Sequence, residues 1–182
     1  MQITVHGTPT PLLGKEQSTG KEAPAARITR IDGTQNVIGM IAPTLQLFIV
    51  MPSLKTEVCS LGAKRFNTLL ASKPKVKATM VTTDALEFVQ GYMTQEGIEH
   101  LDVVIDHDRN FGKKYGVLIG EGKLKDKLAR ALFLIDREGQ IVYREIVGEI
   151  VDEVDYDACI AAIDAQLAIK KKGHTHEDWM SV

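Results

Sequence analysis

Residues 45–70, LQLFIVMPSLKTEVCSLGAKRFNTLL, constrain the fold of this chain more than any other stretch. The first seven residues contain one polar side chain, Gln46, in an otherwise apolar run that Pro52 ends. A run this short and this apolar is typical of a strand buried on both faces. From Val58 to Leu70 the apolar residues recur close to a helical period, so a helix is expected to follow the strand.

The junction between this strand and helix, PSLKTEVC, is where we expect the chemistry of the protein. Thr56 is a good helix N-cap, and Glu57 suits the positive end of the helix dipole. Cys59 then occupies the third helical position, where free backbone N–H groups and the dipole favour thiolate over thiol. Pro52 lacks an N–H and can shield a sulfur without offering a competing donor. Cys59 alone fits a small buried apolar residue equally well, but the combination with Pro52 and Thr56 favours a reactive cysteine.

Length and composition favour one globular domain. The chain has 182 residues and a formal net charge of −2, which gives no electrostatic reason to expect nucleic acid or acidic lipid as a partner. No apolar run approaches the ~20 residues that span a bilayer, so no membrane partner is expected.

The start, MQITVHGTPTPLLG, lacks a signal-peptide pattern, which predicts a cytoplasmic location. The domain is predicted to cover residues 1–168, and residues 169–182 to form a flexible polar tail.

The rest of the chain alternates between strand and helix patterns. Turn residues and polarity predict an N-terminal hairpin, then a loop, then one or two short edge strands with Asp32-Gly33 as a turn. Thr83 and Asp84 are expected to cap a helix that begins near Leu86. The other patterns predict strands over residues 76–82, 101–105, 129–135 and 140–147, and helices over 86–97, 111–117 and around Cys159. The sum is an α/β domain with a mixed sheet, with its site at the carboxyl end of a central strand.

The second cysteine, Cys159, sits in a different kind of sequence. It shares one helical face with Tyr156, Ile160, Ile163 and Leu167, which predicts core packing; the alternative is a role as resolving thiol for Cys59. A structural disulfide is not expected in a reducing compartment.

Neither a metal site nor a phosphate loop stands out. His174, His176 and Asp178 have the chemistry to bind a metal ion, but their place in the polar tail favours a flexible segment. No G-x-x-x-x-G-K-[ST] pattern occurs in the chain.

With these residues in view, the chain resembles the peroxiredoxins, and within them the bacterial thiol peroxidases. The superfamily pattern Pro-x-x-x-Thr-x-x-Cys is complete as Pro52, Thr56 and Cys59. The blocks PSLKTEVC, KRFN, LKDKLARALFLID and GEIVDEVDYDA carry the thiol-peroxidase likeness, which covers roughly residues 1–168.

The resemblance implies a thioredoxin-like fold, no metal or organic cofactor, and reduction of hydroperoxides by a cysteine thiolate. It makes Cys59 the peroxidatic cysteine, Thr56 a hydrogen-bonding partner of the peroxide, and Pro52 a cover for the sulfur. Arg130 matches the arginine of the family that stabilises the thiolate. Without the resemblance, Arg130 would be interpreted as a solvent-exposed charge at the end of a strand. Thr56, a backbone N–H and Arg130 are the candidate donors along the O–O bond.

Two positions depart from the family pattern. The usual place of a resolving cysteine is occupied by Met93, whose thioether cannot form a disulfide and which we expect to pack in the core. Lys55 replaces a common acidic residue and adds positive charge near the thiolate. We therefore expect a one-cysteine enzyme that is recycled by an external thiol, of thioredoxin type, a glutaredoxin or a small thiol. The resemblance also implies a homodimer.

Two other functions use the same residues. A peroxide sensor would be oxidised at Cys59 once and signal to a partner without efficient turnover. A redox-inactive scaffold of the same fold is disfavoured by the complete set of Pro52, Thr56, Cys59 and Arg130.

Overall fold

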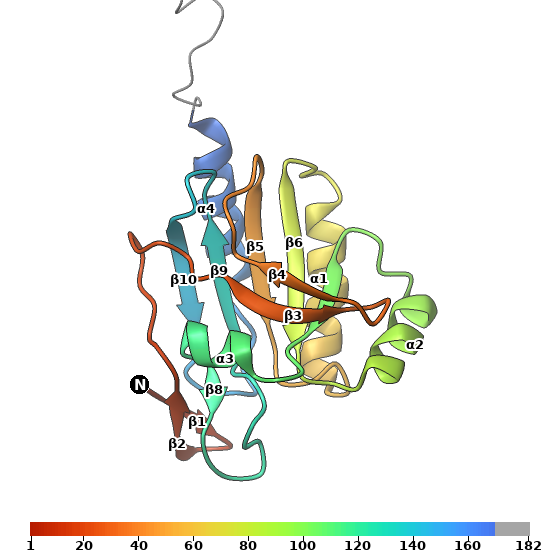
Figure 1. Cartoon of the computed structure of the whole chain (residues 1–182), viewed down its shortest axis with the longest axis vertical. Coiled ribbons are helices and arrows are strands. Elements are labelled where there is room, and N and C mark those ends of the chain that lie inside the picture. The colour runs from red at the N-terminus through yellow and green to blue at the C-terminus, as the bar shows by residue number, and fades with distance from the viewer. Residues whose placement is uncertain (170–182) are drawn as a thin grey trace, which may run out of the picture.

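A seven-stranded mixed sheet forms the centre of the protein, as seen in the computed structural model, which describes residues 1–169 (Figure 1). The strand order is β10-β9-β5-β6-β7-β3-β4. Strands β5, β6 and β7 are parallel to one another, and the remaining pairs are antiparallel. The bounds are β3 Ala26–Arg30, β4 Gln35–Ile38, β5 Leu45–Val50, β6 Val76–Thr82, β7 Asp102–Ile105, β9 Ala131–Ile135 and β10 Ile141–Ile146. The predicted α/β class with a mixed sheet is confirmed.

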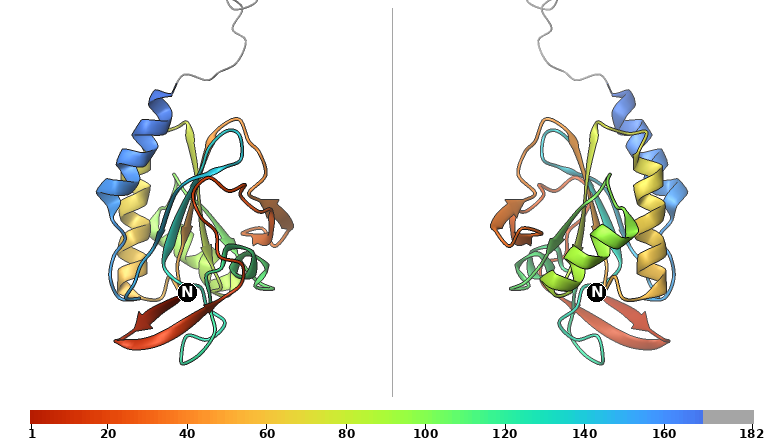
Figure 2. Two further views of the ribbon diagram at one scale, coloured as in Figure 1. Left: turned by 90° about the vertical axis from the view of Figure 1, so that its left-hand side faces the viewer. Right: turned by 90° about the vertical axis from the view of Figure 1, so that its right-hand side faces the viewer.

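Strand β5 is buried along its whole length, as its apolar run predicts. Leu47 and Ile49 point to one core layer, whereas Phe48 and Val50 point to the other, because successive side chains of a strand alternate between faces. The first layer packs against α1 (Glu57–Leu70), α2 (Leu86–Glu96) and α4 (Tyr156–Ala168), and the second against α3 (Asn110–Tyr115). Figure 2 shows α1 and α4 on one side of the sheet and α3 on the other, while β3 and β4 continue the sheet beyond β7.

A second, three-stranded sheet lies near the end of β5 that leads into α1 (Figures 1 and 2). The predicted N-terminal hairpin forms it as β1 (Gln2–Val5) and β2 (Thr8–Leu13). The third strand, β8 (Leu118–Ile119), pairs with β2 and was not predicted, since two residues are too few to show a period.

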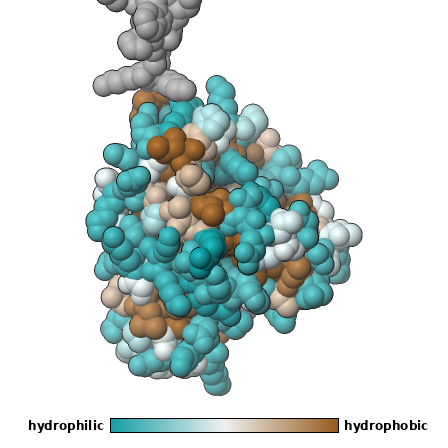
Figure 3. Space-filling model, viewed as in Figure 1, coloured by the Kyte–Doolittle hydropathy of each residue, from teal (hydrophilic) through white to brown (hydrophobic). Residues whose placement is uncertain are grey.

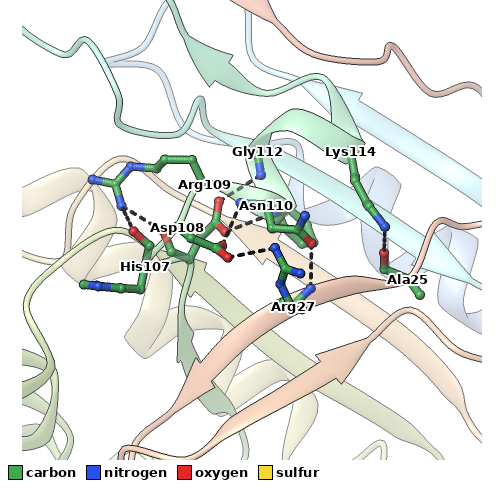
Figure 4. A network of polar contacts seen from close by, with 10 residues as sticks. Ala25, Arg27, His107, Asp108, Arg109, Asn110, Gly112 and Lys114 are labelled. Carbon is green, nitrogen blue, oxygen red and sulfur yellow. Dashed lines mark hydrogen bonds and ion pairs between the residues drawn. The ribbon is translucent and has the colours of Figure 1, made fainter.

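Hydrogen bonds and an ion pair connect α3 and its N-terminal flank with the start of strand β3 (Figure 4). The backbone N–H of Arg27 donates to Asn110 Oδ1 over 2.8 Å, and its guanidinium pairs with Asp108 at 3.1 Å. Lys114 Nζ donates to Ala25 O over 2.8 Å. These bonds fix the position of a helix of only six residues, which is too short to be stable alone.

Some apolar side chains reach the surface. On the face of Figure 3 they form small groups among hydrophilic residues. Within residues 1–169, Met40 and Ile41, between β4 and β5, are the most exposed large apolar residues. Across residues 1–169, no helix has the length and apolar character to cross a membrane. The predicted flexible tail lies outside the described residues, apart from Ile169.

Candidate active site

The turn from β5 into α1 places Cys59 in the first turn of a helix. Helix α1 begins at Glu57, and Thr56 is its N-cap. The N–H of Cys59 donates to Thr56 Oγ1 over 3.3 Å, which confirms both the predicted cap and the third helical position of Cys59. The N–H groups of Glu57 and Val58 have no carbonyl partner within this helix, so they and the dipole favour an anion at Cys59.

Arg130 lies beside Cys59 because β5 and β9 are antiparallel neighbours. Val50 at the end of β5 pairs with Ala131 at the start of β9, so the residue before β9 meets the junction after β5. Arg130 is 7% exposed, and its Nη1 donates to Cys59 Sγ over 3.2 Å. Its interpretation as a solvated strand-end charge is therefore wrong.

The guanidinium of Arg130 is held in place by a backbone carbonyl. Its Nε and Nη2 donate to Ile150 O over 3.3 and 2.9 Å. Arginine stays charged in proteins, and a buried charge needs a partner of opposite sign. Within residues 1–169 no carboxylate forms a salt bridge with Arg130. The sulfur of Cys59, as thiolate, is the atom placed to supply the negative charge.

The hydroxyl proton of Thr56 points to the loop and not to the sulfur. Thr56 Oγ1 donates to Ser53 O over 3.1 Å and accepts from Cys59 N. A hydroxyl has one proton and two lone pairs, so one lone pair of Thr56 is left for a ligand. This geometry leaves Thr56 an acceptor position for a ligand, while its expected role as a donor along an O–O bond stays a prediction.

A cavity of about 430 Å³ lies at this junction and brings three of the four predicted site residues together. Pro52, Thr56 and Arg130 line it, while Cys59 is fully buried and touches Arg130. The other lining residues are apolar, cationic or neutral and include no carboxylate: His6, Ser53, Lys55, Val58, Leu124, Lys127, Ile150 and Val151. The cavity can accept an organic group as well as a small polar molecule.

Cys159 is buried in the core, as predicted. It is fully buried in α4, and both cysteines are free thiols. Burial, together with the nearby charges of Glu145 and Asp155, raises the pKa of Cys159 to about 12. This cysteine therefore stays a thiol at neutral pH and is a poor nucleophile.

Helix α2, which carries Met93, packs along the start of α1. Tyr92 Oη lies 2.9 Å from Ser60 Oγ, and Lys64 pairs with Glu96 at 3.0 Å. Met93 is partly buried against the apolar core, as predicted. It thus occupies the helix that packs beside Cys59 without offering a second thiol.

The predicted cap of α2 is wrong, and the residue concerned serves the active-site loop instead. The N-cap is Ala85, without a side-chain hydrogen bond, and Thr83 Oγ1 has no partner in the described chain. The carboxylate of Asp84 accepts from Ser53 Oγ at 2.6 Å and from Leu54 N at 2.7 Å. The parallel neighbours β5 and β6 bring their carboxyl ends to the same sheet edge, a signal that could have placed Asp84 near residues 52–56.

No group of three metal-ligating side chains occurs among residues 1–169. His174, His176 and Asp178 lie outside that range, and His6 belongs to the cavity described above.

Comparisons with known proteins show the family of this chain. The Redoxin family profile matches residues 18–160. A thiol peroxidase of Aquifex aeolicus (strain VF5) is 38% identical over 159 residues, which cover 87% of this chain and 94% of that protein. A thiol peroxidase of Campylobacter jejuni is 39% identical over 165 residues and 90% of each chain. The crystal structure of a peroxiredoxin-like protein from Aquifex aeolicus superposes with a TM-score of 0.88 at 34% identity, covering 91% of this chain and 96% of that one.

Proposed function

The chain belongs to the Redoxin family, and from this premise we propose that it reduces hydroperoxides with Cys59 as the peroxidatic thiolate. The predicted resemblance to the peroxiredoxins and the thioredoxin-like fold are confirmed by the matched family, relatives and solved structure. Thiol-dependent peroxide reduction is the activity class named for the matched relatives. The assignment of Pro52, Thr56, Cys59 and Arg130 to that reaction is our proposal.

In the proposed step the thiolate of Cys59 attacks the terminal oxygen of R–O–O–H. An S–O bond forms as the O–O bond breaks, so the sulfur is oxidised to sulfenic acid, Cys59–SOH, and the peroxide is reduced. The group R–O⁻ leaves and takes a proton from water. Arg130 donates toward the reacting oxygens and Thr56 Oγ1 accepts a hydrogen bond from the hydroperoxide O–H, whose proton stays on the transferred oxygen; together they hold the O–O bond in line with the sulfur.

The observation that carries this proposal is the 3.2 Å contact between Arg130 Nη1 and Cys59 Sγ. A guanidinium this buried, with a carbonyl on one side and a sulfur on the other, favours the charged form of that sulfur. A thiolate, not a thiol, is the nucleophile that attacks a peroxide.

We propose that an external thiol completes the cycle. It attacks Cys59–SOH, releases water and forms a mixed disulfide, which a second thiol then reduces. The thioether of Met93 and the buried thiol of Cys159 support this one-cysteine route. A thioredoxin-type protein, a glutaredoxin or a small thiol fits the chemistry. A homodimer and a cytoplasmic location belong to the same proposal, and the family resemblance supports the first.

The test is mass spectrometry of the intact protein after one equivalent of peroxide. We expect a gain of one oxygen and labelling of Cys59 by a sulfenic-acid trap. Excess peroxide without a thiol should then drive Cys59 to the sulfinic acid and stop the reaction. Added thiol should instead support many turnovers, which a peroxide sensor would not show.

Loss of two hydrogens with a Cys59–Cys159 link would contradict the one-cysteine route. An unmodified Cys59 would contradict the peroxidase assignment itself.

A further inference from the structure

We propose that Asp84 is a positioning residue for peroxide reduction, because its buried carboxylate fixes the loop that orients Thr56. The inference rests on the proposed function of Cys59 and Thr56. It adds a residue that belongs to none of the motifs in the sequence.

The carboxylate of Asp84 is surrounded by donors from the chain around it. Its Oδ1 accepts from Ser53 Oγ at 2.6 Å, and its Oδ2 accepts from Leu54 N at 2.7 Å and from Thr82 Oγ1 at 3.0 Å. Asp84 is 5% exposed, and within residues 1–169 it pairs with no cation. Short hydrogen bonds to an ionised acceptor are among the strongest in proteins, so this carboxylate holds Ser53 and Leu54 firmly.

Ser53 passes this constraint to the N-cap of α1. Its carbonyl accepts both the N–H of Thr56 at 3.3 Å and the hydroxyl of Thr56 at 3.1 Å. Because the single hydroxyl proton is directed at Ser53 O, the remaining lone pair of Thr56 is available to a peroxide in the cavity. A tilt of the Ser53 peptide would redirect that proton and remove the acceptor.

A neutral amide cannot replace the carboxylate without rotating one of these groups. Asparagine has one acceptor oxygen and two N–H donors, whereas the site presents three donors to two oxygens. In Asp84→Asn the amide NH₂ therefore faces either the hydroxyl of Ser53 or both Leu54 N–H and the hydroxyl of Thr82. In the first orientation the Ser53 hydroxyl must turn and loses its acceptor; in the second, two N–H donors face each other and the loop must shift.

The experiment compares Asp84→Asn, Thr56→Val and the double variant by the rate at which peroxide oxidises Cys59. A second readout is alkylation of Cys59 by iodoacetamide, a thiolate reagent that carries no O–O bond to orient. Misplacement of a positioning group costs up to about 10²-fold, so we expect a roughly 10- to 100-fold slower peroxide reaction in Asp84→Asn. Alkylation should not slow. The double variant should lie within about twofold of Thr56→Val, because Asp84 acts through Thr56.

Asp106→Asn is the matched control. Asp106 is fully buried, and its carboxylate accepts from the backbone N–H groups of Phe111 and Gly112 in α3, with no bond to the loop of Thr56. This variant loses buried hydrogen bonds of the same kind, so it should unfold at a lower temperature while its peroxide rate stays within about twofold of wild type. Ser53→Ala removes the hydroxyl bond to Asp84 but keeps the backbone carbonyl that accepts from Thr56, so it should slow the peroxide reaction in the same way but less, and it serves if Asp84→Asn does not fold.

Two outcomes would overturn the inference while leaving the proposed function intact. One is an unchanged peroxide rate in Asp84→Asn or Ser53→Ala; the other is a double variant far slower than Thr56→Val. If wild-type Cys59 does not react with peroxide at all, the proposed function fails first.

Discussion

Cys59 and Cys159 are both fully buried thiols, yet their surroundings give them opposite chemistry. A guanidinium touches the sulfur of Cys59, and the helix start adds free N–H groups. Cys159 instead lies near the carboxylates of Glu145 and Asp155, which oppose a second negative charge. Burial raises the pKa of Cys159, and the nearby carboxylates raise it further, whereas the proposed peroxidatic Cys59 has a guanidinium as its nearest charge.

Exchanging each cysteine for serine tests this difference. We expect Cys59→Ser to abolish peroxide consumption and Cys159→Ser to keep the rate within about twofold of wild type. The measurement is peroxide loss with excess thiol, with circular dichroism to show that both variants are folded. Similar losses in the two variants would refute the assignment.

Replacing Arg130 tests the counter-charge directly. Arg130→Met keeps an apolar side chain of similar length but removes the Nη1 that contacts Cys59, so the donor proposed to act on the reacting oxygens is lost. Loss of one transition-state donor typically slows a reaction ~10²–10³-fold. Stopped-flow oxidation of Cys59 by peroxide measures this rate in both proteins. Arg130→Lys should rescue little, since an ammonium cannot bond Ile150 O and the sulfur in the same fork geometry.

Among the secondary-structure elements, α2 bears most on how oxidised Cys59 would be reduced, because α2 packs against the start of α1. Tyr92 and Glu96 on α2 hold Ser60 and Lys64 on α1, so the two helices present facing surfaces next to Cys59. Met93, on the same helix, stands at the position where the family pattern has a second thiol.

Met93→Cys is expected to convert the protein into a two-cysteine enzyme. After one equivalent of peroxide its mass should fall by two hydrogens through a disulfide between Cys59 and the introduced thiol, whereas wild type gains one oxygen. The variant should also resist over-oxidation, because the sulfenic acid is consumed by the new thiol. Thr94→Cys is the control, since Thr94 is exposed on the next position of α2. Persistent sulfenic acid in Met93→Cys would show that α1 and α2 do not separate enough to join the two sulfurs.

Elements with a local pattern could be predicted from the sequence, whereas contacts across the chain could not. The apolar run of β5 and the Thr56 cap each depend on a few neighbouring residues. Asp84 bonds Ser53 from 31 positions away, and its place before a helix suggested a cap instead. Arg130 lies 71 positions from Cys59, and only the family resemblance related the two. Sheet order creates both contacts, and no local period encodes sheet order.

At the scale of the whole molecule, one thiol and three tyrosine hydroxyls that stay protonated in the folded protein limit its stability at high pH. Burial is the main cause that raises the pKa of Cys159, Tyr143 and Tyr156 to about 12, from ordinary values of 9.0 for the thiol and 10.0 for the phenols. Burial also raises the pKa of Tyr115. The unfolded chain therefore releases these protons at lower pH than the folded chain does.

We accordingly expect the free energy of unfolding to fall as pH rises from about 9 toward 12, with the contribution of these groups fully present below pH 9. Urea unfolding midpoints measured at intervals between pH 7 and 11 check this expectation, with about one pH unit between points. Cys159→Ala should remove the earliest part of the decline, which begins near the ordinary ionisation of a thiol. A midpoint that does not change over this range would contradict the assignment of these groups as neutral in the fold.

The antiparallel pairing of β5 with β9 divides the molecule into an end that tolerates changes in length and an end that does not. Arg130 reaches Cys59 only while Val50 stays opposite Ala131, and a slip of one residue would turn Arg130 to the other face of the sheet. The turn between β9 and β10 lies at the far end of β9, so residues added at 137–138 leave that register untouched. A label or fused peptide inserted there should leave the activity intact, because it lies at the end of the sheet away from Cys59. In contrast, even one residue inserted between Arg130 and β9 should abolish peroxide reduction.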